Sequence, residues 1–296
     1  MKLFNKINSK IIILFTFVFI FLVFASFFSN SIYAKQSKIQ VIAGITPLKT
    51  FIDKVGGEKI DSSVMIPPGY SPANYAPSPS KLKKISEANY YFTFQMPAEK
   101  SNILPKIKKF NKDIKLIKLD KITLDKYEPR KFSDGGVDPH IWMSTKRVKY
   151  IVEVITNKLI ELDPDNEDYY QKRSNEYLTK LNEMDLYIKD RLSNLKGKTV
   201  LIYHPVLGYF TEEYGLDLKA IEKNGKEATP KRLQELIDFA KNENIKTIFH
   251  QATIDSKQTE VIASEIDGKT VEINPLAENY VENMKKIADL IVNSYK

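Results

Sequence analysis

A single apolar stripe runs through the middle of the chain and constrains the fold more than any other feature. Its residues are spaced 7, 4, 3, 4, 4 and 3 apart, which is the spacing of one helix face: Tyr170, Tyr177, Leu181, Met184, Ile188, Leu192 and Leu195. Pro164 favours a helix start just before the stripe, so the predicted helix has about 31 residues and is about 46 Å long. It is either part of a coiled coil or a rigid spine packed across two lobes. A stripe of only about three and a half heptads in an α/β chain favours the spine.

Short β-type runs alternate with helix-type segments on both sides of this helix. The alternation is typical of βαβ units around a mostly parallel sheet, and it occurs once before the helix and once after it. The predicted strands are 39–45, 62–66, 90–94 and 115–119, then 199–203, 218–222, 246–250 and 270–273. The fold class is therefore α/β, with two similar lobes joined by the long rigid helix. Because such sheets bind ligands at the carboxyl ends of their strands, we expect a cleft between the lobes.

An apolar leader precedes the lobes. Residues 11–28 contain 16 apolar residues in 18, and they follow Lys2, Lys6 and Lys10, the positive start typical of an export signal. Cleavage after Ala34 would remove the leader, whereas 18 uncleaved residues span about 27 Å and just cross a bilayer. The predicted segments are a signal peptide or N-terminal membrane anchor over 1–34, an N-terminal lobe over 35–163, the linking helix over 164–196 and a C-terminal lobe over 197–296.

Cysteine usage and charge exclude several classes of protein. The chain has no Cys, which excludes disulfides, thiolate metal sites and a lipid-modified cysteine. We therefore expect an exported protein that is not a lipoprotein, either at the extracytoplasmic face of the cell membrane or secreted. Without the leader, the chain has 42 basic and 37 acidic residues, interspersed along the sequence. This surplus is too mild and too mixed to indicate nucleic-acid binding, so we expect no nucleic-acid partner. We also expect a monomer.

The three His residues of the chain stand at informative places. His140 lies in Asp138-Pro-His-Ile-Trp, just before a helical segment, while His204 and His250 lie at the ends of predicted strands, where open sheets bind ligands. Three imidazoles without a thiolate suit Zn²⁺ best, and they also accommodate Mn²⁺, Cu²⁺ or Ni²⁺. Asp138 is the expected acceptor of the other ring N–H of His140. The sequence therefore predicts a metal site formed by His140, His204 and His250.

These residues resemble the extracellular solute-binding proteins of metal-importing ABC transporters, the zinc and manganese receptors with a long backbone helix. The resemblance runs from about residue 38 to the C-terminus and rests on short motifs in this order: Val55-Gly-Gly-Glu-Lys-Ile, Ile66-Pro-Pro-Gly, Pro77-Ser-Pro-Ser-Lys-Leu, Asp138-Pro-His-Ile-Trp, Leu162-Asp-Pro-Asp-Asn, His204-Pro-Val-Leu-Gly-Tyr-Phe, Pro230-Lys-Arg-Leu-Gln and Ile273-Asn-Pro-Leu. It implies a divalent metal as cargo and His140 and His204 as metal ligands. His250 is not a ligand position of the family.

The chain also departs from the family pattern. Ala73 stands where the family usually carries a ligand His, and amides stand at positions where acidic residues are usual. Since Mn²⁺ prefers carboxylate oxygens, these changes favour Zn²⁺. Two His ligands alone bind an ion weakly, so either further residues complete the metal shell or the cargo is a metal already held by a small chelator. The further candidates for ligands or cleft contacts are Asn74, Glu222, His250, Gln251 and Asn274.

The leading interpretation is the extracytoplasmic substrate-binding component of a metal ABC transporter. It captures a divalent cation, zinc first, and delivers it to a membrane permease with its ATPase. The alternative among binding proteins is a receptor for a metal chelate or another small polar ligand. An exported zinc hydrolase is a third possibility, but the chain has no His-Glu-x-x-His helix and no Glu placed as a general base. We therefore expect no enzymatic activity.

Overall fold

The computed structural model describes residues 38–223, 225–252 and 257–296. The predicted leader over 1–34 lies outside the described residues. Within the described ranges, no helix has both the length and the apolar character needed to cross a bilayer. Residues 39–296 form one compact unit, which contains both predicted lobes.

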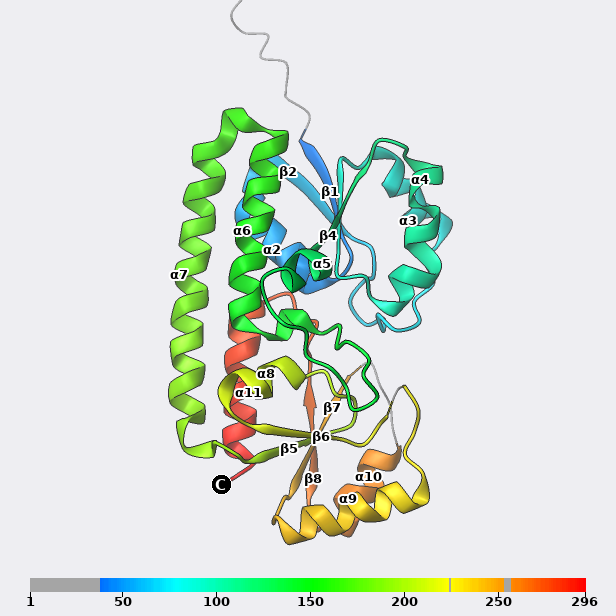
Figure 1. Ribbon diagram of the computed structural model, residues 1–296, viewed down its shortest axis with the longest axis vertical. Helices are drawn as coiled ribbons and strands as arrows, with labels where there is room; N and C mark the ends of the chain where they lie inside the picture. Colours follow the sequence, from blue (N-terminus) through cyan, green and yellow to red (C-terminus); the bar gives the residue numbers. More distant parts are fainter. Residues whose placement is uncertain (1–37, 224, 253–256) are drawn as a thin grey trace, which may run out of the picture. The chain divides into compact units, whose positions relative to one another are not determined.

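Two four-stranded parallel sheets form the two lobes (Figure 1). The first has the order β2-β1-β3-β4 and consists of β1 (Ile39–Ala43), β2 (Ile60–Val64), β3 (Tyr90–Thr93) and β4 (Lys115–Lys118). The second repeats this order as β6-β5-β7-β8, with β5 (Thr199–Ile202), β6 (Asp217–Ala220), β7 (Thr247–Gln251) and β8 (Lys269–Ile273). Each strand pair is parallel, so the carboxyl ends of each sheet share one edge. The predicted fold class of two similar α/β lobes is confirmed.

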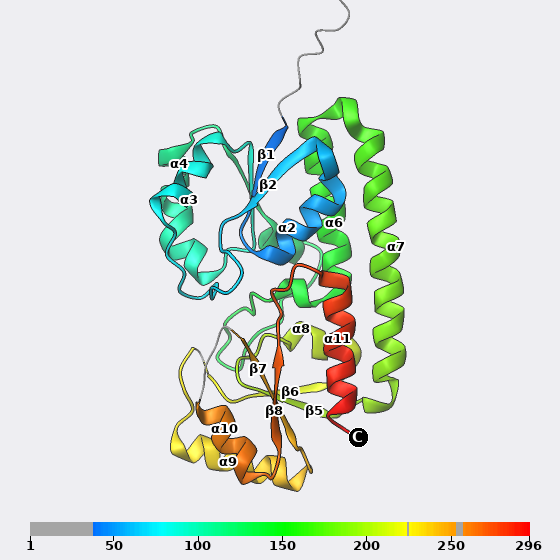
Figure 2. The ribbon, with the colours of Figure 1, turned by 180° about the vertical axis from the view of Figure 1, so that it is seen from behind.

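A long helix lies along the back of both lobes (Figures 1 and 2). It consists of a 3₁₀ turn at Pro164–Asn166, α7 (Glu167–Leu192) and a second 3₁₀ turn at Ser193–Leu195. Helix α7 packs against α2 (Thr46–Gly56), α6 (Thr145–Leu162) and α11 (Tyr280–Asn293). The apolar stripe is buried from Tyr170 to Leu192, which confirms the predicted spine.

Six further helices complete the described fold. They are α3 (Pro79–Lys83), α4 (Ile107–Phe110), α5 (Leu119–Leu124), α8 (Gly208–Tyr214), α9 (Pro230–Asn242) and α10 (Lys257–Glu265), with 3₁₀ turns at Gly57–Lys59, Lys84–Glu87, Leu104–Lys106 and Ile141–Met143. Helix α10 packs against α9 and the sheet strands β7 and β8. Residues 99–110 form no continuous helix; they are divided into a π-helical turn at Glu99–Ile103, a 3₁₀ turn and α4. Pro105 explains the break, because proline lacks the N–H that would continue the helix.

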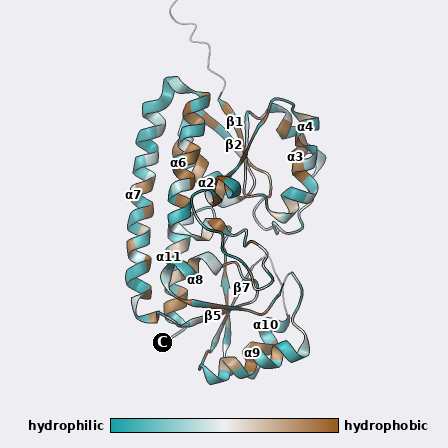
Figure 3. Cartoon of the chain, in the orientation of Figure 1, coloured by the Kyte–Doolittle hydropathy of each residue, from teal (hydrophilic) through white to brown (hydrophobic). Residues whose placement is uncertain are grey.

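One hydrophobic core runs behind both sheets. It includes Val41 of β1, Leu181 of α7, Ile202 of β5 and Met284 of α11, each fully or almost fully buried. Helix α7 is largely hydrophilic in Figure 3, with apolar residues at intervals, as expected of a helix that buries one face. A smaller cluster fills the space under α9 and α10. The core therefore belongs to both lobes together.

A buried carboxyl group supports the loop that follows β3. Glu99 is fully buried; its Oε2 accepts the Met96 N–H and its Oε1 accepts the Tyr91 hydroxyl, both at 3.0 Å. Gly44 lies so close that an added Cβ would overlap the carboxylate. Burial raises the pKa of Glu99 to about 7, although hydrogen bonds from Thr93, Met96 and Tyr91 oppose the shift. The folded chain therefore favours the protonated form of Glu99.

Changing Glu99 to Gln is expected to flatten the dependence of stability on pH. Because the folded pKa of about 7 lies above the ordinary 4.5, the stabilisation is complete below pH 4.5 and is lost as the pH rises through 7. Glutamine imitates the protonated carboxyl at every pH. We expect similar free energies of unfolding at pH 5, and a variant more stable by on the order of 2 kcal/mol at pH 8. Urea unfolding at both pH values checks this, and equal pH dependence in both proteins would contradict it.

Candidate metal centre

A cleft of about 1080 Å³ lies where the carboxyl ends of the two sheets meet. Gln95 lies just after β3 of the first sheet and lines the cleft. From the second sheet, His204 lies after β5, Glu222 lies after β6 and Gln251 ends β7, and these three also line the cleft. The connection between α5 and α6 contributes His140. The position agrees with the rule that parallel sheets bind ligands beyond the carboxyl ends of their strands.

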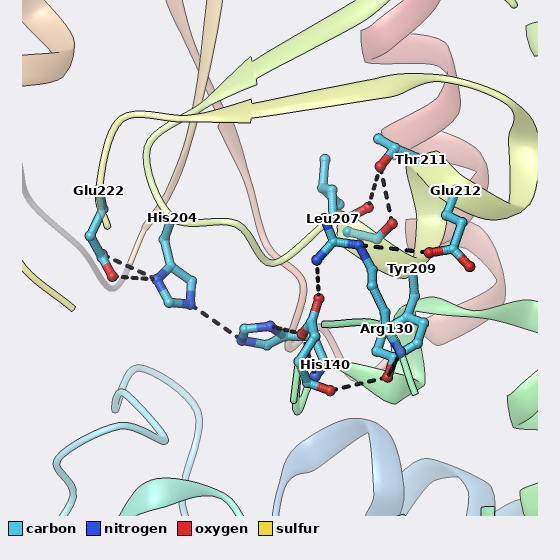
Figure 4. A network of polar contacts seen from close by, with 10 residues as sticks. Arg130, His140, His204, Leu207, Tyr209, Thr211, Glu212 and Glu222 are labelled. Carbon is cyan, nitrogen blue, oxygen red and sulfur yellow. Dashed lines mark hydrogen bonds and ion pairs between the residues drawn. The ribbon is translucent and has the colours of Figure 1, made fainter. Parts of the chain in front are cut away.

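Two imidazoles face each other in this cleft (Figure 4). The Nε2 atoms of His140 and His204 are 3.2 Å apart, and the two rings are nearly perpendicular at 86°. His140 is buried, with 6% of its surface exposed, whereas His204 is partly open to the cleft. The structure thus brings together the two His residues that come from motifs 64 positions apart.

A buried carboxylate sets the ring of His140. His140 donates its Nδ1–H to Asp138 Oδ1 at 2.7 Å and its backbone N–H to the same oxygen at 2.9 Å. Arg130 donates to Asp138 Oδ2 at 2.8 Å. Burial alone would raise the pKa of Asp138, but the hydrogen bond and charge of His140, together with the Arg130 charge, hold that pKa below its ordinary value. Asp138 therefore stays an acceptor and leaves the Nε2 lone pair of His140 directed into the cleft.

Burial also acts on His140 itself. It lowers the pKa of the imidazole, because a charged ring loses its hydration there, although Asp138 opposes the shift. The ring is therefore neutral near pH 7. A neutral imidazole with its Nδ1–H already donated is the form that binds a metal through Nε2.

Glu222 acts on His204 as Asp138 acts on His140. His204 donates its Nδ1–H to the Glu222 carboxylate, whose two oxygens are both 3.1 Å away (Figure 4). The sequence suggested Glu222 as a further ligand or cleft contact. The structure places it in the cleft, but with its oxygens engaged by the ring of His204. Both imidazoles thus have an outer carboxylate and a free Nε2.

Two residues that hold Asp138 in place, Arg130 and Tyr209, were not predicted from the sequence. Arg130 donates its backbone N–H to the Tyr209 hydroxyl, and that hydroxyl donates to the carbonyl of Asp138, both at 3.1 Å. Gly208 packs so tightly that an added Cβ would overlap Arg130 and Asp138. Tyr209 stands in the His204-Pro-Val-Leu-Gly-Tyr-Phe motif and could have been noticed there. No sequence signal marks Arg130, which lies in the connection between α5 and the 3₁₀ turn at Ile141–Met143.

Other predicted residues do not join the pair. His250 lies within β7 and does not line the cleft, whereas its neighbour Gln251 does. Asn74 and Asn274 are exposed and also do not line the cleft, although Ala73 does. Among the residues that the structure describes, no three or more His, Asp or Glu side chains are grouped to hold one metal ion. The expectation of a cleft containing all three His residues thus has no geometric support.

Relatives with known names resemble the chain over most of its length. The high-affinity zinc uptake system protein ZnuA of Bacillus subtilis is 26% identical over 283 residues, which is 88% of this chain and 89% of that protein. The manganese-binding lipoprotein MntA of Halalkalibacterium halodurans is 28% identical over 268 residues, or 86% and 88% of the two chains. A crystal structure of ZnuA has a TM-score of 0.83 and 31% identity, and the match covers 88% of this chain and all of that one.

These names correct the predicted localisation. The absence of Cys led us to expect that the chain is not a lipoprotein, but MntA and several further relatives are named lipoproteins. The expectation was wrong because it rested on one residue type alone. It set the chain apart from relatives that match it over most of its length.

The family model extends over almost the whole described chain. It is the model described as ZnuA, zinc-uptake complex component A, periplasmic, and it matches residues 41–294. That range contains the second sheet, all of the first except the start of β1, the long helix, and the pair of His140 and His204. The resemblance inferred from the motifs is confirmed, and this chain belongs to the ZnuA family.

Proposed function

We propose that this chain is the substrate-binding component of a metal ABC transporter, which captures a divalent cation and delivers it to a membrane permease and its ATPase. The separation of 3.2 Å between the two Nε2 atoms carries the proposal. Zn–N bonds of about 2.0–2.1 Å at a tetrahedral angle place two ligand nitrogens about 3.3 Å apart. The two rings are thus spaced as ligands of one ion, and because one chain supplies both, we propose that it acts as a monomer.

Zinc is the favoured cargo. Both donors that face the cleft are imidazole nitrogens, and the nearest carboxylates, Asp138 and Glu222, are engaged with the Nδ1 atoms of the rings. Imidazole suits Zn²⁺, whereas Mn²⁺ prefers carboxylate, carbonyl and water oxygens. One of the relatives is named for zinc and the other for manganese. Between these two metals, the imidazole donors of this chain favour zinc.

The arrangement supports binding rather than catalysis. Hydrolytic zinc sites pair the metal-bound water with a general base. Here the carboxylates beside the rings already accept hydrogen bonds from His140, His204 and Arg130. The proposal therefore includes no chemical step.

Titration of the purified full-length chain with zinc and with manganese tests the function. We expect one equivalent of zinc to bind, at least about 10-fold more tightly than manganese, because the carboxylates beside the two rings, Asp138 and Glu222, already accept hydrogen bonds from the Nδ1 atoms. Isothermal titration calorimetry gives both constants. Binding of neither metal would overturn the proposed function, and tighter binding of manganese would overturn the choice of zinc.

A further inference from the structure

The described residues that line the cleft carry more positive than negative charge. The basic ones come from both lobes and from the connection between them: Lys100, Arg130, Lys131, Lys219, Lys223 and Arg232. The acidic ones are Asp134, Glu222 and Glu235. A surplus of positive charge repels a bare dication and attracts an anion.

The ion pairs of the cleft do not remove this surplus. Arg130 pairs with Asp138, and Arg232 pairs with Glu235. Lys100, Lys131 and Lys223 form no ion pair with any residue that the structure describes, and all three side chains are exposed. Three lysines therefore direct uncompensated positive charge toward whatever enters the cleft.

The cleft is also larger than a single ion requires. Its volume is about 1080 Å³. A dication with six waters occupies only about 200 Å³, at about 30 Å³ for each water. Clefts of about 300–1,000 Å³ are typical of sites for small organic molecules. The size alone thus fits a metal that arrives with an organic partner.

A buried amide group without a partner belongs to the wall of the same cleft. Gln251 lines the cleft with only 7% of its surface exposed, and its Nε2 has no hydrogen-bond partner among the described residues. A buried amide N–H that lacks an acceptor costs about 1–3 kcal/mol.

We propose that the cargo of this cleft is a zinc ion already held by a small anionic chelator with carboxylate donors. This inference rests on the proposed function and specifies its substrate class. His140 and His204 supply two nitrogen ligands, and the carboxylates of the chelator fill the other coordination positions. The remaining negative charge of the complex is attracted by Lys100, Lys131 and Lys223. The chelator thus supplies the ligands that the chain itself does not bring to the His pair.

Zinc nitrilotriacetate is a suitable probe, because this chelator is carboxylate-rich, its complex is anionic, and it leaves positions on the metal for two imidazoles. The full-length chain is used without a polyhistidine tag, which would itself bind the probe. Native mass spectrometry is expected to show one chain with both zinc and nitrilotriacetate. The cationic zinc complex of tris(2-aminoethyl)amine is expected not to bind. Zinc transfer to the chain without retained nitrilotriacetate would overturn the inference.

Charge variants give the second test. The triple variant Lys100→Gln, Lys131→Gln, Lys223→Gln is expected to bind zinc nitrilotriacetate at least about 10-fold more weakly, yet to bind free zinc as well as the unchanged chain or better. The matched control is Lys172→Gln, Lys180→Gln, Lys196→Gln, which removes the same charge from exposed positions on and just after the long helix. Equal effects of the two triple variants on the chelate, or weaker free-zinc binding in the first, would contradict a local role of the cleft lysines.

The two proposals fail in different ways. If free zinc binds tightly through His140 and His204 and the chelate is not retained, the proposed function stands and the chelate inference is overturned. If the unchanged chain binds neither free zinc nor zinc nitrilotriacetate, the proposed function itself is overturned.

Discussion

Replacing His140 and His204 together by alanine is expected to lower zinc affinity by more than about 100-fold. Loss of a single outer partner of a metal ligand already costs about 10- to 100-fold in affinity. The double variant removes both Nε2 donors. Among the described residues, no other His side chain lines the cleft. Competition with a chromogenic zinc indicator measures the loss over several orders of magnitude.

His250→Ala is the matched control for the double variant. It removes an imidazole that is partly exposed on β7 but does not line the cleft. We expect its zinc affinity to equal that of the unchanged chain. A large loss in His250→Ala would instead restore the three-histidine site that the sequence suggested, and an unchanged affinity in the double variant would exclude the His pair as the metal site.

Replacing Trp142 by alanine is expected to destabilise the chain by about 3–5 kcal/mol, the usual cost of truncating a large buried aromatic residue. Trp142 has 1% of its surface exposed and stacks on Phe94, just after β3, with ring centroids 5.9 Å apart. Its Nε1–H donates to the carbonyl of Pro275, just after β8, at 2.9 Å. The indole thus joins the ends of both sheets, and the midpoint of urea unfolding measures its loss.

Trp142→Phe separates the two contributions of this residue. Phenylalanine retains most of the apolar contact with Phe94 but leaves the carbonyl of Pro275 without its donor. We therefore expect a smaller loss, about 1–3 kcal/mol. The His140 ring also packs edge-on against the indole, at 5.3 Å between centroids, so zinc affinity is expected to fall in Trp142→Ala. A loss of less than about 1 kcal/mol in Trp142→Ala would contradict a linking role.

Much of the fold was predictable because apolar periodicity reports burial directly. The stripe from Tyr170 to Leu195 predicted the spine, since a helix that buries one face repeats apolar residues every three or four positions. The two sets of strands were predictable because strands of parallel sheets are covered on both faces and form short apolar runs. Helix α5 was missed because its sequence, Leu-Asp-Lys-Ile-Thr-Leu, is too short to show a helical period.

The site was predictable only where sequence position fixes geometry. His204 lies two residues after the end of β5, and Asp138 lies two residues before His140. The local direction of the chain therefore sets where each of these side chains lies. His250 was expected at the end of its strand, but β7 continues to Gln251. Because side chains alternate across a strand, that one residue directs Gln251 rather than His250 into the cleft. Arg130 acts through tertiary contacts that no local pattern reports.

The shared core has a consequence for how the chain acquires its structure during synthesis. Helix α11 is the last helix of this sequence, yet it packs against α7 and contributes Met284, Ile287 and Ile291 to the core behind both sheets. While α11 is still unmade, both sheets therefore lack part of the core that they share. An N-terminal unit that folds during synthesis leaves this apolar surface uncovered. We therefore expect the docking of α11 on α7 to be a late step of folding.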